Sequence, residues 1–232
     1  MSVQKGGRGR LLVYGLWALT LGGVLPARAG LLFDSQGFES PHYVPGKLAD
    51  QKGWFSDNLG TNLPVVQTKI FHAGRQALYT PRGTNTESTL TAWQNLVPAA
   101  TGIVQVALAV RAGSMAPAGV YFNAVYIYRD SYTGDRAAIL YLEADGDIRL
   151  SEAGVGDRLV GSWKSDTWYA LNFRLNTHTQ SLDLFVNNAQ VVTNFPFLTP
   201  AATSVGGVAV QEYSGLVGGG LYVDDLKIGT LP

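Results

Sequence analysis

The residues best suited to chemistry are carboxylates in one short run, Glu143-Ala144-Asp145-Gly146-Asp147. Residues two apart on a strand point to the same side, so an unbroken strand would place three carboxylates on one face. Retaining hydrolysis of a glycosidic bond needs two carboxyl groups about 5 Å apart, one as nucleophile and one as acid and base. However, the pair Asp145-Gly146 is a strong signal for a hairpin turn. Because a turn breaks the alternation, we expect no catalytic carboxylate pair here.

Other catalytic motifs are missing from the sequence. The chain has no cysteine, no G-x-S-x-G, no H-E-x-x-H and no Gly-rich phosphate loop. Its three histidines, His42, His72 and His178, fall in predicted loops or turns, where a surface histidine is the simplest interpretation. The sequence therefore predicts no enzyme, and a glycan-active enzyme with an unfamiliar site is the alternative.

Aromatic and polar side chains suggest carbohydrate binding. Aromatic rings stack on the apolar faces of pyranose rings, and Asp, Asn and Arg form hydrogen bonds with sugar hydroxyls. Two groups of candidate ligand-binding residues stand out, one on a predicted hairpin and one in a tyrosine-rich stretch. They are Trp168, Asn172, Arg174 and Asp183 in the first group, and Tyr121, Tyr126 and Tyr128 in the second.

The first group lies on the element that organises the rest of the sequence, residues 162 to 192. From 168 to 175, apolar residues alternate with polar ones, which predicts a strand that buries one face. The buried face is predicted to hold Tyr169, Leu171, Phe173 and Leu175. The residues 176 to 180 form a polar reversal, and Leu182, Leu184 and Val186 repeat the alternation. Asn187-Asn188 predicts a second tight turn, because asparagine tolerates a positive φ.

The hairpin carries a resemblance to a known family. The pattern W-Y-x-L, a polar turn and L-x-L-F-V-N-N resembles the hairpin of laminin-G-like and pentraxin-like jelly rolls of the concanavalin A-like lectin/glucanase superfamily. The order FESPHYVPGKLADQKGW followed by HAGRQAL is similar to the opening of the secreted bacterial laminin-G-like type. The resemblance implies an all-β fold, a two-sheet antiparallel β-sandwich of the jelly-roll type. Glucanases of this superfamily carry E-x-D-x-E on one strand, from which Asp147 departs.

The first 29 residues have the pattern of a secretory signal peptide. Three basic residues precede an apolar stretch from Leu11 to Leu25, and Ala27-Arg28-Ala29 fits a small-x-small cleavage site. An uncleaved membrane anchor is the alternative, but the apolar stretch is shorter than the ~20 residues of a spanning helix. We therefore expect residues 30–232 to form one lectin-like domain, secreted, periplasmic or on the cell surface, with no transmembrane segment after cleavage.

Charge and cysteine content narrow the possible partners. The chain has 17 Lys and Arg and 17 Asp and Glu, and four of the basic residues lie in the leader, which leaves 13 against 17 and a net charge of −4. A mildly acidic domain argues against a nucleic-acid partner, which would need a basic surface. Without cysteine, the stability of an exported chain must come from packing or from a bound ion.

A possible ion site follows from the chain ends. Jelly rolls commonly pair their first and last strands, here 31–39 with 221–228, which would gather Asp34, Glu39, Asp224 and Asp225. Neighbouring carboxylates repel unless they are hydrogen-bonded, protonated or bridged by a cation such as Ca²⁺. The ending Y-V-D-D-L-x-I resembles the terminal strand of jelly rolls that hold a structural Ca²⁺ near this edge. Backbone hydrogen bonds or ion pairs with Arg and Lys are the alternative, and no cofactor is required.

The sequence thus predicts an exported, non-catalytic, lectin-like domain that binds a polysaccharide or another cell-surface partner. Two alternatives stay open at this point. One is a glycoside hydrolase or polysaccharide lyase with a non-standard site, and the other is a structural envelope protein without a small ligand.

Overall fold

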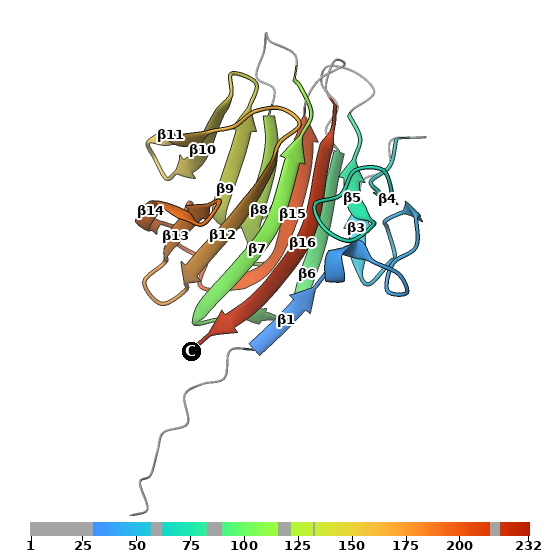
Figure 1. Ribbon diagram of the computed structural model, residues 1–232. Coiled ribbons are helices and arrows are strands. Elements are labelled where there is room, and N and C mark those ends of the chain that lie inside the picture. The colour runs from blue at the N-terminus through green and yellow to red at the C-terminus, as the bar shows by residue number, and fades with distance from the viewer. Residues whose placement is uncertain (1–29, 57–61, 83–89, 116–121, 132, 214–218) are drawn as a thin grey trace, which may run out of the picture.

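A computed structural model describes residues 30–56, 62–82, 90–115, 122–131, 133–213 and 219–232. In these residues the chain forms two antiparallel sheets that lie face to face, one in front of the other (Figure 1). The predicted all-β sandwich is therefore confirmed. The predicted leader, residues 1–29, lies outside the described residues.

The nine-stranded sheet, sheet A, contains the first and the last strand. Its order is β14 (Ala189–Pro196), β13 (Ser181–Val186), β12 (Trp168–Asn176), β7 (Ile103–Ala112), β16 (Leu221–Leu231), β5 (Ala77–Thr80), β4 (Val65–Gln67) and β2 (Gly46–Lys47). In addition, β1 (Gly30–Asp34) pairs with the end of β16. The expected pairing of the first and last strands is confirmed.

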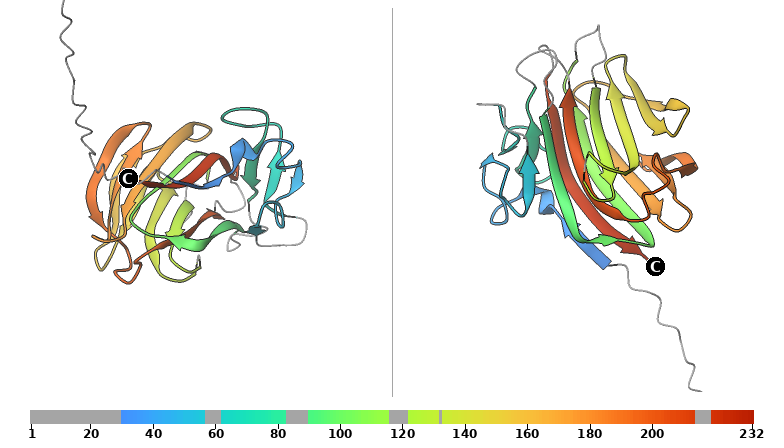
Figure 2. Two further views of the ribbon diagram at one scale, coloured as in Figure 1. Left: turned by 90° about the horizontal axis from the view of Figure 1, so that it is seen from below. Right: turned by 180° about the vertical axis from the view of Figure 1, so that it is seen from behind.

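The seven-stranded sheet, sheet B, faces the viewer when the molecule is seen from behind (Figure 2). Its order is β11 (Gly156–Ser162), β10 (Asp147–Glu152), β9 (Arg136–Glu143), β8 (Phe122–Tyr128), β15 (Val205–Tyr213), β6 (Leu90–Ala100) and β3 (Trp54–Ser56). A single 3-10 turn, η1 (Gln36–Phe38), completes the described elements.

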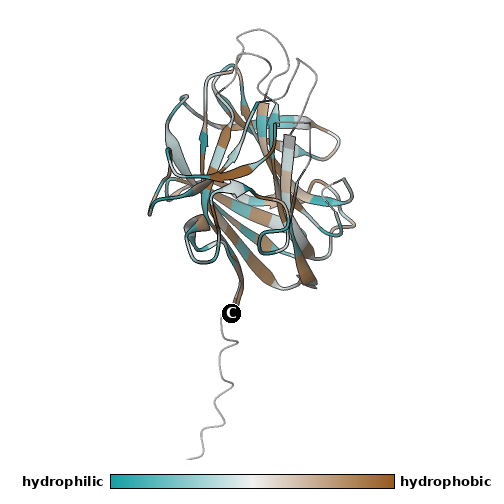
Figure 3. Cartoon of the chain, turned by 90° about the vertical axis from the view of Figure 1, so that its right-hand side faces the viewer, coloured by the Kyte–Doolittle hydropathy of each residue, from teal (hydrophilic) through white to brown (hydrophobic). Residues whose placement is uncertain are grey.

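The core lies between the sheets and follows from the alternation in the sequence. On β12, Leu171, Phe173 and Leu175 are buried while Ala170 and Arg174 are exposed, as the hairpin pattern predicts. Figure 3 shows hydrophobic and hydrophilic residues alternating along the strands. Because only alternate residues enter the core, each sheet keeps an outward face that is free to carry other side chains.

Local backbone chemistry sets where strands end. Asn187 and Asn188 both have positive φ, 50° and 67°, so the predicted turn after β13 is confirmed. Gly146, with φ 93°, turns the chain between β9 and β10, as expected. The expectation of one strand from Leu31 to Glu39 is wrong, because β1 ends at Asp34 and η1 follows with positive φ at Gln36, Gly37 and Phe38.

Close approach of backbones explains one glycine in sheet B. The ring of Tyr128 lies over Gly207 on the neighbouring strand, and its hydroxyl donates toward Gln94 O at 2.9 Å and lies 2.8 Å from Asn95 Oδ1. A Cβ atom on Gly207 would overlap Gln94 O and lie 2.6 Å from Cζ of Tyr128. Only glycine leaves room for this arrangement.

The described part of the chain contains no helix with the length and apolar character needed to cross a membrane.

Candidate functional site

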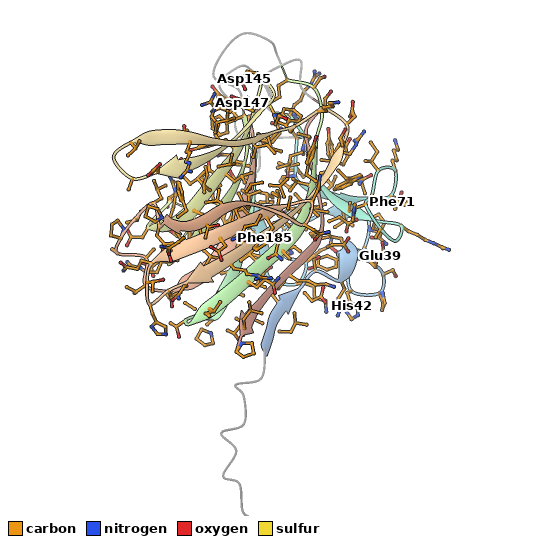
Figure 4. The ribbon with its side chains drawn as sticks, turned by 60° about the vertical axis from the view of Figure 1, so that its left-hand side comes forward. Glu39, His42, Phe71, Asp145, Asp147 and Phe185 are labelled. Carbon is orange, nitrogen blue, oxygen red and sulfur yellow. The ribbon has the colours of Figure 1, made fainter. Side chains whose placement is uncertain are left out.

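The predicted polar face of the hairpin exists and points away from the core. The side chains of Asn172 and Arg174 on β12, and of Asp183 on β13, lie on the outward face of sheet A, because their neighbours in sequence are buried. Phe185 lies on the same face, beside β12 and β13 (Figure 4). Neighbouring strands extend this surface.

A row of residues crosses sheet A in register at the level of Arg174. Arg174 pairs with Asp183 on β13 and with Gln105 on β7, Gln105 pairs with Gly229 on β16, and Gly229 pairs with Leu31 on β1. On the other side, Asp183 Oδ1 accepts a hydrogen bond from the backbone N–H of Asn194 on β14 at 2.9 Å. We call these six residues, from Asn194 to Leu31, the cross-strand row.

Two cavities lie along this row and share Leu231. The first, of about 760 Å³, is lined on β12 to β14 by Arg174, Asn176, Ser181, Asp183 and Asn194, and on the other side by Ile103, Leu231 and Pro232. The second, of about 340 Å³, is lined by Gln105, Ala107, Lys227, Gly229 and Leu31 among others. The two cavities adjoin at Leu231 and lie on the outward face of β14, β13, β12, β7, β16 and β1; we call the pair the cross-strand groove.

Polar side chains in the groove are held in place yet keep hydrogen-bonding capacity. The Arg174 guanidinium lies 4.7 Å from the centre of the Phe185 ring, a cation–π contact that favours this position of the side chain. Gln105 Nε2 donates to Asn172 Oδ1 at 3.0 Å. Within the described part of the chain, no ion pair joins Arg174 to the opposite Asp183. The site thus offers planar donors beside a carboxylate acceptor, which suits hydroxyl groups.

Trp168 lies on the same face but outside the groove. It sits six residues before Arg174 on one strand, a separation of about 20 Å. Its ring and that of His72 pack at a steep angle with 5.4 Å between ring centres, and His72 Nδ1 lies 2.9 Å from Asp225 Oδ2. The sequence prediction placed Trp168 in one binding site with Arg174, whereas the fold separates the two residues.

The predicted tyrosines lie on the other sheet. Tyr126 and Tyr128 point outward from sheet B, where they pack with Ala124, Ile139 and Ala209. Tyr128 is completely buried and its hydroxyl donates to Gln94 O, so in this structure its ring offers no surface to a ligand. Tyr126 is also nearly buried, and its hydroxyl donates to Gln211 Oε1. Tyr121 lies outside the described residues.

The carboxylate run is held by one arginine. Arg149 on β10 forms ion pairs with Glu143 at 2.8 Å, with Asp145 at 3.8 Å and with Asp147. Asp145 and Asp147 lie together at the turn between β9 and β10 (Figure 4). Burial raises the pKa of Glu143, while Arg149 opposes that shift. The carboxylates therefore surround a cation at a turn rather than facing one another across a strand.

The four predicted metal ligands do come together. Asp34, Glu39 and Asp225 line one cavity of about 280 Å³ beside η1, and Asp224 Oδ1 and Asp225 Oδ1 both approach Gly37. Figure 4 shows Glu39 beside this turn. The sequence predicted the neighbourhood, but not the 3-10 turn at its centre.

Backbone N–H groups already bind most of these carboxylates. Asp224 Oδ2 accepts from His72 and Ala73 at 2.9 and 3.2 Å, and Glu39 Oε1 accepts from the N–H groups of Arg75 and Gln76. Among the described residues, no group of three or more His, Cys, Asp or Glu side chains is arranged to hold a metal ion. As arranged, the residues do not fit a calcium site, and structural Ca²⁺ stays a prediction of the resemblance.

We expect Asp224 to make stability depend on pH. Burial raises its pKa from 3.8 to about 6, against the lowering effect of the backbone N–H donors. Since the folded state then holds a proton that the unfolded state has lost, stability should fall as pH rises from about 4 to 6, by up to about 3 kcal/mol. Urea unfolding at several pH values measures this slope. The slope should shrink in Asp224→Asn, which does not titrate there.

The comparison depends on slopes rather than on absolute stability, because the asparagine amide would face a backbone donor. Equal slopes for both proteins would contradict the assignment. Running the same series in EDTA and in millimolar calcium tests the metal hypothesis, since binding only to the folded state raises its stability.

Several residues of the groove were not predicted from the sequence. Gln105 shows a usable signal, since GIVQVALAV alternates and places Gln105 and Ala107 opposite the valines. Gly229, Leu31 and Asn194 carry no such signal, because their place depends on which strands become neighbours.

Comparison with known proteins supports the fold but does not assign the chain to a family. No protein-family model matches the sequence, and no curated protein matches it. Among solved structures, a sialidase has a TM-score of 0.66 at 12% identity, covering 88% of this chain and 19% of the sialidase. The chain thus spans about a fifth of that protein.

Two further structures match over nearly their whole length. The carbohydrate esterase vb_24B_21 from Shiga toxin-encoding bacteriophage phi24B has a TM-score of 0.63 at 16% identity, covering 88% of this chain and all of that one. The cellulose induced protein Cip1 has a TM-score of 0.53 at 14% identity, with 81% and 97% covered. At these identities the likeness shows the fold alone: the chain is a β-sandwich of the kind found in these proteins.

Proposed function

We propose that this chain is an exported, non-catalytic, lectin-like domain of the concanavalin A-like superfamily that binds a polysaccharide in the cross-strand groove. The observation that carries the proposal is the run of polar side chains on four neighbouring strands, Asn194, Asp183, Arg174 and Gln105, along cavities open to solvent. Arg174 and Asp183 supply hydrogen-bond donors and acceptors at its centre, as sugar hydroxyls require.

The geometry of the carboxylate run supports a binding role over catalysis. Glu143, Asp145 and Asp147 are engaged by Arg149, and they lie on sheet B, away from the groove. The fold itself also occurs in a sialidase and in a carbohydrate esterase, so a glycan-active enzyme is the alternative to test. A structural envelope protein without a small ligand is the other.

A polysaccharide array followed by two activity assays separates the three possibilities. We expect binding to at least one polysaccharide, with no release of reducing ends and no unsaturated product absorbing in the ultraviolet. Turnover of a bound glycan would establish the enzyme alternative. No binding in the array and no activity in either assay would favour the structural role.

Arg174→Ala and Asp183→Ala should each weaken binding at least about tenfold, since each removes a group at the centre of the groove. Arg136→Ala is a matched control: Arg136 also lies over an aromatic ring, that of Tyr126, at 5.2 Å, but both residues belong to sheet B. Affinity measured by titration calorimetry should be unchanged in that control. An equal loss in all three variants would contradict the site.

A further inference from the structure

The second cavity of the cross-strand groove has a basic but no acidic lining. Among the described residues that surround its 340 Å³, Lys227 is the one charged side chain, and Gln105 and Thr230 add polar groups. Gly30 lines the cavity as well, because β1 begins beside the end of β16 (Figure 1). A concave surface that carries charge of one sign attracts ions of the opposite sign, here anions.

Export would add a second cation to this cavity. The predicted cleavage site lies between Ala29 and Gly30. Hydrolysis of that peptide bond consumes one water molecule, leaves a carboxylate on the leader and turns the Gly30 nitrogen into an α-ammonium group. In the structure this nitrogen donates a hydrogen bond to Thr230 Oγ1 at 3.1 Å. Because an ammonium group has three donors, two of them stay available to a ligand.

The other charges near the second cavity belong to the two cavities beside it. In the first cavity of the groove, Arg174 and Asp183 oppose each other on neighbouring strands, so their charges offset. The cavity beside η1, which Lys227 also lines, holds three carboxylates, those of Asp34, Glu39 and Asp225. Within the residues that the structure describes, no ion pair engages Lys227.

The two cations are close enough to share one small anion. Lys227 lies three residues before Thr230 on β16, a separation of ~10 Å between their backbones. The flexible lysine stem can shorten this distance. Without the leader, 13 basic and 17 acidic side chains give a net charge of −4, so the protein as a whole repels anions. Anion binding would therefore depend on this local pair of cations.

We infer that cleavage before Gly30 completes an anion-binding site, in which the Gly30 α-ammonium and the Lys227 ammonium hold a single oxyanion. The oxyanion is either a free ion or an acidic substituent of a sugar, since both offer the same acceptor oxygens. This site goes beyond the proposed function, because it needs no polysaccharide.

The exported, processed protein tests the inference directly. Mass spectrometry should find Gly30 as the first residue, and a retained leader or any other first residue would overturn the inference. Sodium sulfate and sodium glucuronate, added at constant ionic strength, should each shift the backbone NMR signals of Gly229 and Thr230 until saturation. The tighter of the two probes identifies the free ion or the acidic sugar as the better source. No saturable shift with either probe would overturn the site.

The position of the amino group provides the sharpest test. An α-amino group ordinarily loses its proton near about pH 8, so affinity should fall at least about fivefold between pH 7 and pH 9. Inserting Ser-Gly between Ala29 and Gly30 would move the new amino group up to ~7 Å away, with the first residue again confirmed by mass spectrometry. This variant keeps every other titratable group near β1, including Asp34 on β1 and Asp224 and Asp225 on β16.

We expect the insertion to weaken binding at pH 7 at least about fivefold and to remove the fall between pH 7 and pH 9. Unchanged affinity, or an unchanged fall with pH, would overturn the role of the α-ammonium group.

A matched pair of lysine variants tests the second cation. Lys227→Gln should weaken binding at least about fivefold. Lys47→Gln makes the same change at an exposed position on β2 of sheet A that lines neither cavity of the groove, and should have no effect. Equal affinities of the two variants would mean that Lys227 faces the acidic cavity, and would overturn the shared site. These titrations contain no polysaccharide, so their failure and a failure of the proposed function are independent.

Discussion

Replacing Gly207 with alanine should destabilise the protein by about 3 to 5 kcal/mol or more, a large share of the stability of an ordinary domain. The new methyl group would overlap the backbone carbonyl of Gln94, which is fixed by the pairing of β6 with β15. It would also displace the Tyr128 ring and break the contacts of a buried hydroxyl. Neither neighbour can move without disturbing sheet B.

The matched control for this variant is Gly161→Ala on β11, in the same sheet. A Cβ atom at Gly161 would lie 3.6 Å from Cδ1 of Ile148, which is an ordinary van der Waals contact. We expect the control to change stability by less than about 1 kcal/mol in urea unfolding. If both variants unfolded at the same urea concentration, the close packing of Tyr128 over Gly207 would be refuted.

Phe173→Ala should cost about 3 to 5 kcal/mol, because it removes a completely buried ring from the centre of β12 and leaves a cavity. Its neighbour Arg174 lies on the outward face, so Arg174→Ala should cost only about 0.5 to 1 kcal/mol through its contact with Phe185. Urea unfolding of the two variants compares the two faces of one strand directly.

One of these two variants should lose binding and the other should lose stability. Arg174→Ala should remain folded while losing affinity for polysaccharide, whereas Phe173→Ala should lose stability first. Similar losses of stability in the two proteins would mean that the outward face of β12 is covered, and the groove would then be unavailable to a ligand.

The local pattern of the hairpin was enough to predict its structure. Alternation around Phe173 fixed which residues are buried, and Asn187-Asn188 fixed the turn, because both effects act between neighbours in sequence. The acidic neighbourhood of Asp34 and Asp225 was also predictable, from the pairing of the chain ends.

The groove was only half predictable, because it depends on pairing between distant strands. Arg174 and Asp183 were identified on one hairpin, but Gly229 and Leu31 join them only through the register of β16 and β1. The burial of Tyr128 was unpredictable for a similar reason. Its burial depends on a glycine, Gly207, that lies far away in sequence and leaves space for its ring.

The pairing of β1 with β16 has a mechanical consequence. The two strands are antiparallel, with Gly30 opposite Thr230, so both ends of the described chain leave from the same side. A force that pulls these ends apart would load the hydrogen bonds between the strands one after another, because such bonds lie across the strands. The pair of Leu31 with Gly229 is among the first under load, and it forms one end of the groove. Tension on the chain ends therefore reaches the groove before it reaches the core.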